Sequence, residues 1–194
     1  MQYRALTLHA LVLTATVALA GAFGAAPAWA QKVKLDTSMG EVVLELDAAK
    51  APKTVDNFVK YVSAGHYDGT VFHRVIDGFM VQGGGMTPDM KEKTTRAPIP
   101  LESGNGLTNV RGSVSMARTS VPGSATAQFF INLVDNARLD ASTPGLNGYA
   151  VFGKVVSGTD VVDKIRAVSV ADNGPHQNVP VKPVVITKAS VLPK

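Results

Sequence analysis

The run Phe72-His-Arg-Val-Ile-Asp-Gly-Phe-Met-Val-Gln-Gly-Gly84 places two strand-like segments on either side of an Asp77-Gly78 turn. Asp-Gly between apolar segments is a strong short-range signal of a β-hairpin. Arg74 and Gln82 stand among large apolar side chains, where a guanidinium is costly unless its charge or its donors are used. The run therefore predicts a hairpin that contributes to a binding or catalytic groove.

Outward from this hairpin, short apolar runs have the length of strands. Residues 33–46 alternate apolar and polar side chains around a turn at 37–40, which predicts an N-terminal hairpin. Further strands are predicted by the runs Val114–Met116, Phe129–Asn132, Val151–Val156 and Val184–Leu192. The segment Thr87–Asn109 is rich in Pro, Gly and charge, and we expect a long surface excursion there.

Two segments have helical periodicity instead. Pro52 suits a first helical turn, and the apolar stripe that follows ends before Gly65. The members of that stripe are Val55, Phe58, Val59 and Val62. A second, shorter helix begins near Thr159 or Asp160. Many short strands with two helices predict a mainly β fold, a closed or nearly closed antiparallel sheet with a helix over each open end.

The first thirty residues have the pattern of a secretory signal peptide. Arg4 precedes a long apolar stretch, and Ala28-Trp29-Ala30 offers small residues at a cleavage point before Gln31. A retained membrane anchor is the alternative, since the stretch is nearly long enough to span a bilayer. The Ala-x-Ala end and the abrupt change to polar residues favour cleavage, which would leave residues 31–194 as one domain without stable membrane insertion.

Composition argues against several classes of function. The formal charge of +4 would fall to about +3 on cleavage, with no basic cluster, which is unlike a nucleic-acid-binding protein. The absence of cysteine excludes thiol catalysis and zinc–thiolate sites. No Gly-x-Ser-x-Gly elbow and no metal-binding motif occurs, and His66, His73 and His176 lack a Ser or Asp partner at a motif spacing. The groove remains the candidate site.

Several motifs, in order along the chain, resemble the cyclophilin family of peptidyl-prolyl isomerases. They are Phe72–Gly84, Gly112–Arg118, Ala127–Asn132, Tyr149–Val155 and Gln177–Ile186, with the helix stripe in Thr54–Val62. The resemblance covers essentially all of residues 32–192. It implies a closed eight-stranded antiparallel β-barrel capped by two α-helices, with peptidyl-prolyl cis-trans isomerase activity. The exported start and Tyr149 are most similar to the periplasmic cyclophilins of Gram-negative bacteria, which implies a periplasmic location and a role in folding exported proteins.

The resemblance also implies a role for individual residues. Arg74 matches the catalytic arginine of the family, against the alternative of a surface ion pair. The residues that match the substrate-binding surface are Phe79, Met80, Gln82, Ala117, Arg118, Gln128, Phe130, Leu139 and Tyr149. Phe79, Met80, Phe130 and Leu139 would form an apolar slot for the proline ring, although their residue types alone fit ordinary core packing equally well. His73 is interpreted as a packing or hydrogen-bonding residue, because isomerisation requires no proton transfer.

Two departures from the family pattern concern ligand binding. Many eukaryotic members have Trp where this chain has Arg138, and His where it has Tyr149. Since that Trp contributes to binding of the cyclic-peptide inhibitor cyclosporin, we expect weak cyclosporin binding. The implied partners are proline-containing unfolded or exported polypeptides, with no cofactor, no metal and no nucleic acid, and we expect a monomer. A peptide-binding chaperone module with incidental isomerase activity is the alternative function.

Overall fold

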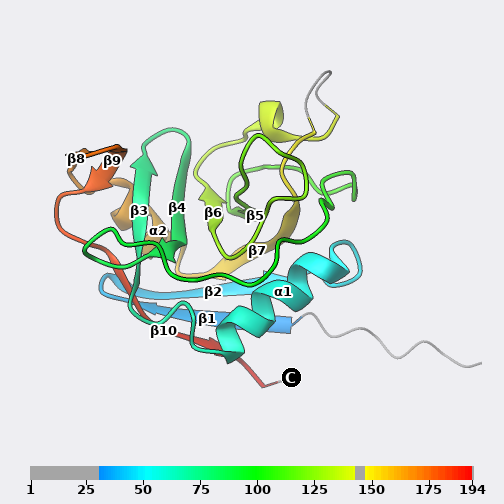
Figure 1. The fold of residues 1–194 in the computed structure, drawn as a ribbon, viewed down its shortest axis with the longest axis horizontal. Coiled ribbons are helices and arrows are strands. Elements are labelled where there is room, and N and C mark those ends of the chain that lie inside the picture. Colours follow the sequence, from blue (N-terminus) through cyan, green and yellow to red (C-terminus); the bar gives the residue numbers. More distant parts are fainter. Residues whose placement is uncertain (1–30, 143–146, 194) are drawn as a thin grey trace, which may run out of the picture.

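The computed structural model describes residues 31–142 and 147–193, and its centre is a closed barrel of antiparallel strands (Figure 1). The eight barrel strands are β1 (Gln31–Thr37), β2 (Gly40–Leu46), β3 (Thr70–Ile76), β4 (Met80–Met86), β5 (Ser113–Met116), β6 (Phe129–Asn132), β7 (Val151–Ser157) and β10 (Val185–Val191). Their order around the barrel is β1-β10-β3-β4-β6-β5-β7-β2, and β2 pairs with β1 to close it. The predicted mainly β barrel is confirmed.

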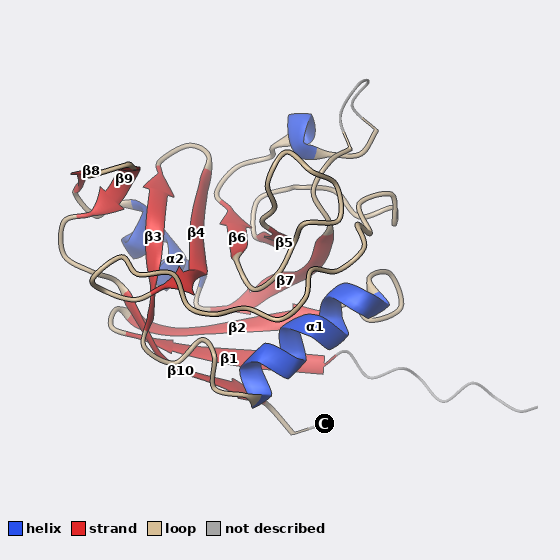
Figure 2. Cartoon of the chain, in the orientation of Figure 1, coloured by secondary structure: helices blue, strands red, loops and turns tan. Residues whose placement is uncertain are grey.

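Both predicted helices are present and lie against different strands (Figure 2). Helix α1 (Pro52–Ser63) has Pro52 in its first turn and contacts β10. Helix α2 (Thr159–Arg166) follows Gly158 and contacts β2, β3 and β4. A side chain at Gly158 would lie 2.2 Å from the Glu41 carbonyl oxygen, so only glycine lets the chain pass this close to β2.

Aromatic side chains fill the barrel interior next to α1. The ring of Phe58 lies 5.0 Å from those of Tyr67 and Phe152 and 5.4 Å from that of Phe129. All four side chains are fully buried. Large aromatic side chains supply much of the apolar area that a core removes from water. This cluster therefore packs α1 firmly against the barrel, through Phe129 on β6 and Phe152 on β7.

The predicted surface excursion is largely exposed, but it is tethered to α1. Ala51, at the N-terminal cap position, provides no side-chain hydrogen bond. Instead, Glu102 accepts hydrogen bonds from the backbone N–H groups of Lys53 (3.1 Å) and Thr54 (2.8 Å) and from the Thr54 hydroxyl (2.7 Å). A carboxylate at a helix N-terminus satisfies unpaired N–H groups and favours the helix dipole.

The structure contains elements that the sequence pattern did not predict. A two-stranded sheet joins β8 (Val170–Asn173) to β9 (His176–Pro180), and a short 3₁₀ helix spans Ala137–Leu139. All four residues of β8 are exposed, so this hairpin has no buried face to give it an alternating pattern. The Asn173-Gly174 turn, with Gly174 at φ 59°, is the sequence feature that indicates a hairpin here.

The predicted leader, residues 1–30, lies outside the described residues. Among the residues that are described, no helix is both long and apolar enough to cross a membrane.

Candidate active site

A row of side chains crosses three neighbouring strands on the outside of the barrel. Arg74 on β3 pairs with Gln82 on β4, and Gln82 pairs with Phe130 on β6. Directly opposite residues of antiparallel strands project from the same face. Because their neighbours Val81 and Ile131 belong to the buried core, the row faces outward. Arg74 at its end lines a cavity, and we call this outward surface the groove.

Arg74 is half-buried at one end of this row and is unpaired. Within residues 31–142 and 147–193, its guanidinium makes no hydrogen bond or ion pair. Arg111 shows the opposite behaviour, because its Nη2 donates to both carboxylate oxygens of Asp163, at 2.8 and 3.0 Å, and its Nη1 donates to the Leu133 carbonyl at 2.6 Å. The alternative of a surface ion pair at Arg74 is therefore wrong, and its donors remain available.

The amides of Gln82 and Gln128 are joined beside Arg74. Gln82 Nε2 donates to Gln128 Oε1 at 2.9 Å, and the Ala117 N–H donates to the Gln128 carbonyl at 2.9 Å. A side chain on Gly85 would meet Gln128 Cγ at 2.4 Å, so glycine leaves the space in which Gln128 lies. The structure thus brings three predicted residues, Gln82, Ala117 and Gln128, to one side of the groove.

The four predicted residues of the proline slot lie at the other side. Met80 and Phe130 are almost fully buried, at 2% and 4% exposure, and Phe79 and Leu139 are half-buried. The Phe79 carbonyl accepts hydrogen bonds from the Leu133 N–H (3.0 Å) and from Asn136 Nδ2 (2.9 Å). These bonds hold the turn after β3 against the segment that follows β6.

Two guanidinium groups stack on aromatic rings at the rim of this slot. Arg118 lies 4.6 Å from the ring centroid of Tyr149, and Arg138 lies 4.8 Å from that of Phe79. Tyr149 packs edge-on against Phe130, at 5.5 Å between centroids. Since the Tyr149 hydroxyl has no hydrogen-bond partner within the described ranges, it can bond to a ligand.

A buried polar network supports the slot, and sequence reasoning missed it. Asn132 Nδ2 donates to Ser113 Oγ at 2.9 Å, and its Oδ1 accepts from Asn136 Nδ2 at 2.7 Å. Asn109 donates through its Nδ2 to the Leu139 carbonyl at 3.1 Å and to Asp140 Oδ1 at 2.8 Å. These residues come from loops and strand ends without a common spacing, so no sequence pattern marked them.

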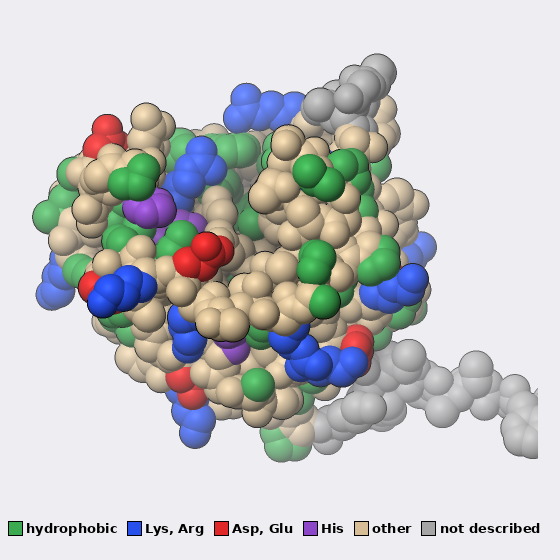
Figure 3. All heavy atoms as spheres, in the orientation of Figure 1, with side chains coloured by type: hydrophobic (Ala, Val, Ile, Leu, Met, Phe, Trp, Pro, Cys, Tyr) green, Lys and Arg blue, Asp and Glu red, His purple; other side chains and the backbone are tan. Residues whose placement is uncertain are grey.

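A cavity of about 360 Å³ opens next to Arg74, between β3, β4 and the β8–β9 hairpin. Figure 3 shows histidine side chains gathered beside a basic group on this face. We call it the histidine pocket; His73, Arg74, Met86, Gln128, His176 and Gln177 line it. His176 and Gln177 were not among the predicted site residues, because the hairpin that carries them was not predicted.

His73 lies in the wall of this pocket at 6% exposure, which fits the packing role in its interpretation as a packing or hydrogen-bonding residue. Its Nδ1 is buried and has no hydrogen-bond partner among the described residues. Burial, the main cause, lowers the pKa of His73 from 6.5 to about 4, and the charges of His176 and Arg74 act in the same direction. The Val71 carbonyl opposes the shift, although it is not in hydrogen-bond geometry with Nδ1. His73 is therefore neutral at neutral pH.

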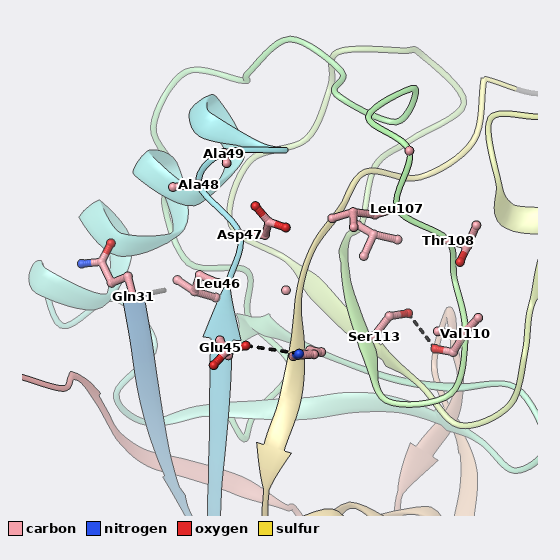
Figure 4. Close-up of a pocket in the computed structure, with 14 residues that line it drawn as sticks. Gln31, Glu45, Leu46, Asp47, Ala48, Ala49, Leu107, Thr108, Val110 and Ser113 are labelled. Carbon is pink, nitrogen blue, oxygen red and sulfur yellow. Dashed lines mark hydrogen bonds and ion pairs between the residues drawn. The ribbon is translucent and has the colours of Figure 1, made fainter. Parts of the chain in front are cut away.

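A second cavity, of about 490 Å³, lies between the end of β2, the start of β7 and residues 106–113, and we call it the β2–β7 cavity. Figure 4 shows Leu46 and Asp47 on one side of it and Leu107 and Thr108 on the other. Its charged groups are engaged: Lys154 Nζ lies 3.2 Å from Glu45 Oε1, and Asp47 Oδ1 accepts from the Lys50 N–H at 3.0 Å. None of the predicted site residues lines it.

Comparison with known proteins agrees with this geometry. The family described as "Cyclophilin type peptidyl-prolyl cis-trans isomerase/CLD" matches residues 32–191. The chain is 59% identical over 162 residues to peptidyl-prolyl cis-trans isomerase cyp18 of Streptomyces antibioticus, covering 82% of this chain and 98% of that protein. It is 53% identical over 187 residues to peptidyl-prolyl cis-trans isomerase A of Dickeya dadantii, covering 94% of this chain and 98% of that protein.

Solved structures have the same fold. A cyclophilin type peptidyl-prolyl cis-trans isomerase of Cryptosporidium parvum, determined in the presence of the dipeptide Ala-Pro, superposes with a TM-score of 0.70 at 25% identity. The match covers 84% of this chain and 100% of that chain. The fold, the outward-facing groove with its unpaired arginine, and the sequence matches agree with one another. The chain belongs to the cyclophilin family and is a peptidyl-prolyl cis-trans isomerase.

Proposed function

We propose that this cyclophilin is exported to the periplasm, where it isomerises X–Pro bonds in exported polypeptides and so assists their folding, with Arg74 as its catalytic residue. The observation that carries the catalytic assignment is the half-buried guanidinium of Arg74, unpaired within the described residues and aligned with Gln82 and Phe130. A buried cation without a partner is costly, so its retention in a groove indicates that a ligand supplies the partner.

The reduction in barrier that catalysis needs is small. Amide resonance sets a rotation barrier of roughly 18–20 kcal/mol, and uncatalysed X–Pro isomerisation takes on the order of tens to hundreds of seconds. Turnover in the ordinary range of ~1–10³ s⁻¹ requires the barrier to fall by about 3–7 kcal/mol. One well-placed charged hydrogen bond together with correct positioning supplies a reduction of this size.

Arg74 supplies that hydrogen bond in the proposed mechanism. As the amide twists, the prolyl nitrogen loses conjugation and becomes pyramidal, and its lone pair becomes a hydrogen-bond acceptor. An N–H of Arg74 aimed at this nitrogen stabilises the twisted state more than either planar isomer, which raises turnover. No covalent bond breaks and no proton is transferred, so the step calls for neither a metal nor a cofactor.

The remaining groove residues bind the peptide. Phe79, Met80, Phe130 and Leu139 take up the proline ring, and Gln82 donates to a substrate carbonyl. Backbone groups at Ala117 and Arg118 pair with the extended peptide, while Gln128 and the Tyr149 hydroxyl add hydrogen bonds at either end. The Ala117 N–H already donates to Gln128, so its carbonyl is the group left for the substrate.

The test of the catalytic assignment is Arg74→Ala in a protease-free isomerisation assay on an Ala-Pro peptide. We expect kcat/KM to fall by about 10²–10³-fold, the loss seen when one preorganised donor is removed from an active site, with peptide binding retained. Arg111→Ala is the matched control, because its guanidinium pairs with Asp163 outside the groove. If Arg74→Ala binds and isomerises the peptide as the parent does, the assignment is wrong.

Support for export comes from the N-terminal residues and from one relative. Residues 31–194 make up 164 of the 194 residues, or about 85% of the chain. The alignment with the Dickeya dadantii isomerase covers 94% of the chain, so it extends into the first thirty residues. We expect the protein expressed in a Gram-negative host to appear in the periplasmic fraction with an intact mass that begins at Gln31. A full-length mass confined to the cytoplasm would contradict export.

We also propose that the mature protein is a monomer without stable membrane insertion. Five large hydrophobic residues are exposed within the described ranges, and they are scattered except that Val170 and Val181 adjoin at the β8–β9 hairpin; the others are Val110, Val121 and Val156. Scattered single residues do not form the contiguous apolar patch that an oligomer interface needs. Light scattering of the purified mature protein should give the mass of one chain, and a dimer mass would contradict this.

A further inference from the structure

The histidine pocket presents hydrogen-bond donors that the isomerisation step does not use. Arg74 carries five N–H donors, and a single one suffices for the prolyl nitrogen. Gln128 uses its Oε1 to accept from Gln82, which leaves its own NH₂ unpaired within the described residues. His176 and Gln177 add an imidazole and an amide from β9.

The histidine pocket is lined by a positive charge and by no negative one. Arg74 supplies a permanent positive charge, and no Asp or Glu is among the lining residues. Two acidic residues belong to neighbouring segments: Asp172 on β8, whose carboxylate accepts from the Asn178 N–H, and Glu92, whose backbone bridges to Met86. The Glu92 side chain is exposed and forms no ion pair with Arg74 or His176 in the described part of the chain. Within the described residues, no carboxylate forms an ion pair with Arg74.

The pocket is also held in place before any ligand binds. Gly85 leaves the space that Gln128 fills, as its Cβ would lie 2.4 Å from Gln128 Cγ. His176 is tied to the hairpin by its pairing with Asn173 across the Gly174 turn. Donors that are fixed before binding lose little entropy when a ligand arrives.

We propose that the histidine pocket is a subsite for an acidic side chain of the substrate, an Asp or Glu within about three residues of the proline. A carboxylate accepts several hydrogen bonds at once and prefers charged donors, which matches the convergence of Arg74, Gln128 and His176. An extended chain advances about 3.3–3.6 Å per residue, so only residues close to the proline reach a cavity that shares Arg74 with the reacting bond. This assignment rests on the proposed role of Arg74 and adds a substrate class to it.

The experiment compares Glu with Gln in otherwise identical peptides, at each of three positions on either side of an Ala-Pro bond. For the parent protein, we expect kcat/KM at one position to be about three- to tenfold higher for Glu than for Gln, as for a single charge pair near the surface. The ratio should fall toward one at about 0.5 M salt, where exposed charges are screened.

The variants address the pocket without touching the catalytic arginine. His176→Ala should lower the Glu/Gln ratio toward one while leaving turnover of the Gln peptide within about twofold of the parent. His176→Glu should invert the ratio, because it places a negative charge in the pocket. Gln177→Glu is a second charge-reversal variant that keeps the test open if His176→Glu does not fold, as judged by circular dichroism.

A Glu/Gln ratio within twofold at every position in the parent, or a ratio unchanged by both charge reversals, would overturn the subsite. These outcomes differ from failure of the proposed catalytic role, which would show in the neutral peptide. If Arg74→Ala turns over the Gln peptide as fast as the parent does, the catalytic assignment fails. If Arg74 is needed for the Gln peptide but the ratio is flat, only the subsite fails.

Discussion

The β2–β7 cavity is larger than the histidine pocket, at about 490 Å³ against about 360 Å³, yet its charged side chains and Ser113 are paired. Glu45 pairs with Lys154, and Ser113 Oγ donates to the Val110 carbonyl at 2.7 Å. In the histidine pocket, Arg74 and His73 Nδ1 have no partner within the described residues. Buried polar groups are almost always paired, so unpaired ones identify a binding site better than volume does.

The two regions are also connected. Ser113 lines the β2–β7 cavity and accepts a hydrogen bond from Asn132, which accepts one from Asn136, and Asn136 donates to the Phe79 carbonyl in the proline slot. The network therefore ends at a wall of the active groove. A residue that lines the β2–β7 cavity therefore helps, through this network, to hold Phe79 in the predicted proline slot.

The largest expected effect that tests this contrast concerns the buried histidine. Because the folded pKa of His73 is about 4 and the ordinary value is 6.5, the unfolded chain takes up a proton first as the pH falls. The free energy of unfolding should be highest above about pH 6.5. It should fall by up to about 3 kcal/mol as the pH is lowered from about 6.5 to about 4. Urea unfolding at about pH 7, 5.5 and 4 measures this.

His73→Gln is the control for that titration, because it keeps a polar side chain and removes the ionisable group. The pKa of His66 is also lowered, chiefly by burial, so both proteins will retain some loss of stability toward acid. The difference between parent and variant isolates His73. Identical pH dependence in the two proteins would mean that the pocket does not hold a neutral histidine.

The next effect in size concerns the network that joins the two regions. Asn132→Leu removes the acceptor of one of the two Asn136 Nδ2 hydrogen bonds, and it also removes the donor to Asn109 Oδ1 and Ser113 Oγ, in a buried place. An unsatisfied buried polar group costs about 1–3 kcal/mol, so the midpoint of urea unfolding should fall accordingly. Thr108→Ala, at an exposed position of the β2–β7 cavity, should change stability by less than about 0.5 kcal/mol. Equal effects of the two changes would contradict a structural role for the network.

The sequence predicts the groove well where its residues follow strand periodicity. The hairpin predicted around Asp77-Gly78 is confirmed; its loop spans the three residues between Ile76 and Met80, and this register places Arg74 opposite Gln82. The helix after Pro52 is likewise confirmed, because its buried stripe has helical spacing. The barrel order and the later slot residues depended on the family resemblance, since pairing between strands distant in sequence leaves no local pattern.

What the sequence did not predict depends on contacts between distant segments. Glu102 caps α1 across a separation of 48 residues, and the helix start itself offers only Ala51. The β8–β9 hairpin is exposed along β8 and lacks an apolar face, so His176 could not be assigned to the surroundings of Arg74. In both cases the interaction is polar and long-range, and hydrophobic periodicity carries no information about it.

A smaller effect tests the rim of the proline slot. Arg138 covers the ring of Phe79 and is exposed, where a Trp would offer a flat apolar surface to cyclosporin. We expect weak cyclosporin binding by the parent and about tenfold tighter binding by Arg138→Trp, since buried Trp residues are frequent hot spots. Arg138→Ala is the control in the same cyclosporin titration, because it shows how much of the change in affinity comes from losing the arginine and how much from adding the indole. Binding by Arg138→Trp that is no tighter than the parent would count against the rim assignment.

The smallest effect is expected from filling the larger cavity, and it tests the contrast most directly. Leu107 lines the β2–β7 cavity and Met86 lines the histidine pocket, and both side chains are half-buried. Leu107→Phe should leave kcat/KM within about twofold of the parent for all peptides, as expected of a change outside any binding surface. Met86→Phe reduces the space beside Arg74, so it should lower kcat/KM for the preferred Glu peptide by about threefold and affect the Gln peptide less, a loss that corresponds to less than 1.4 kcal/mol. If Leu107→Phe impaired turnover as much as Met86→Phe does, the β2–β7 cavity would take part in function although its charged groups are paired, and unpaired donors would not distinguish the binding site in this fold.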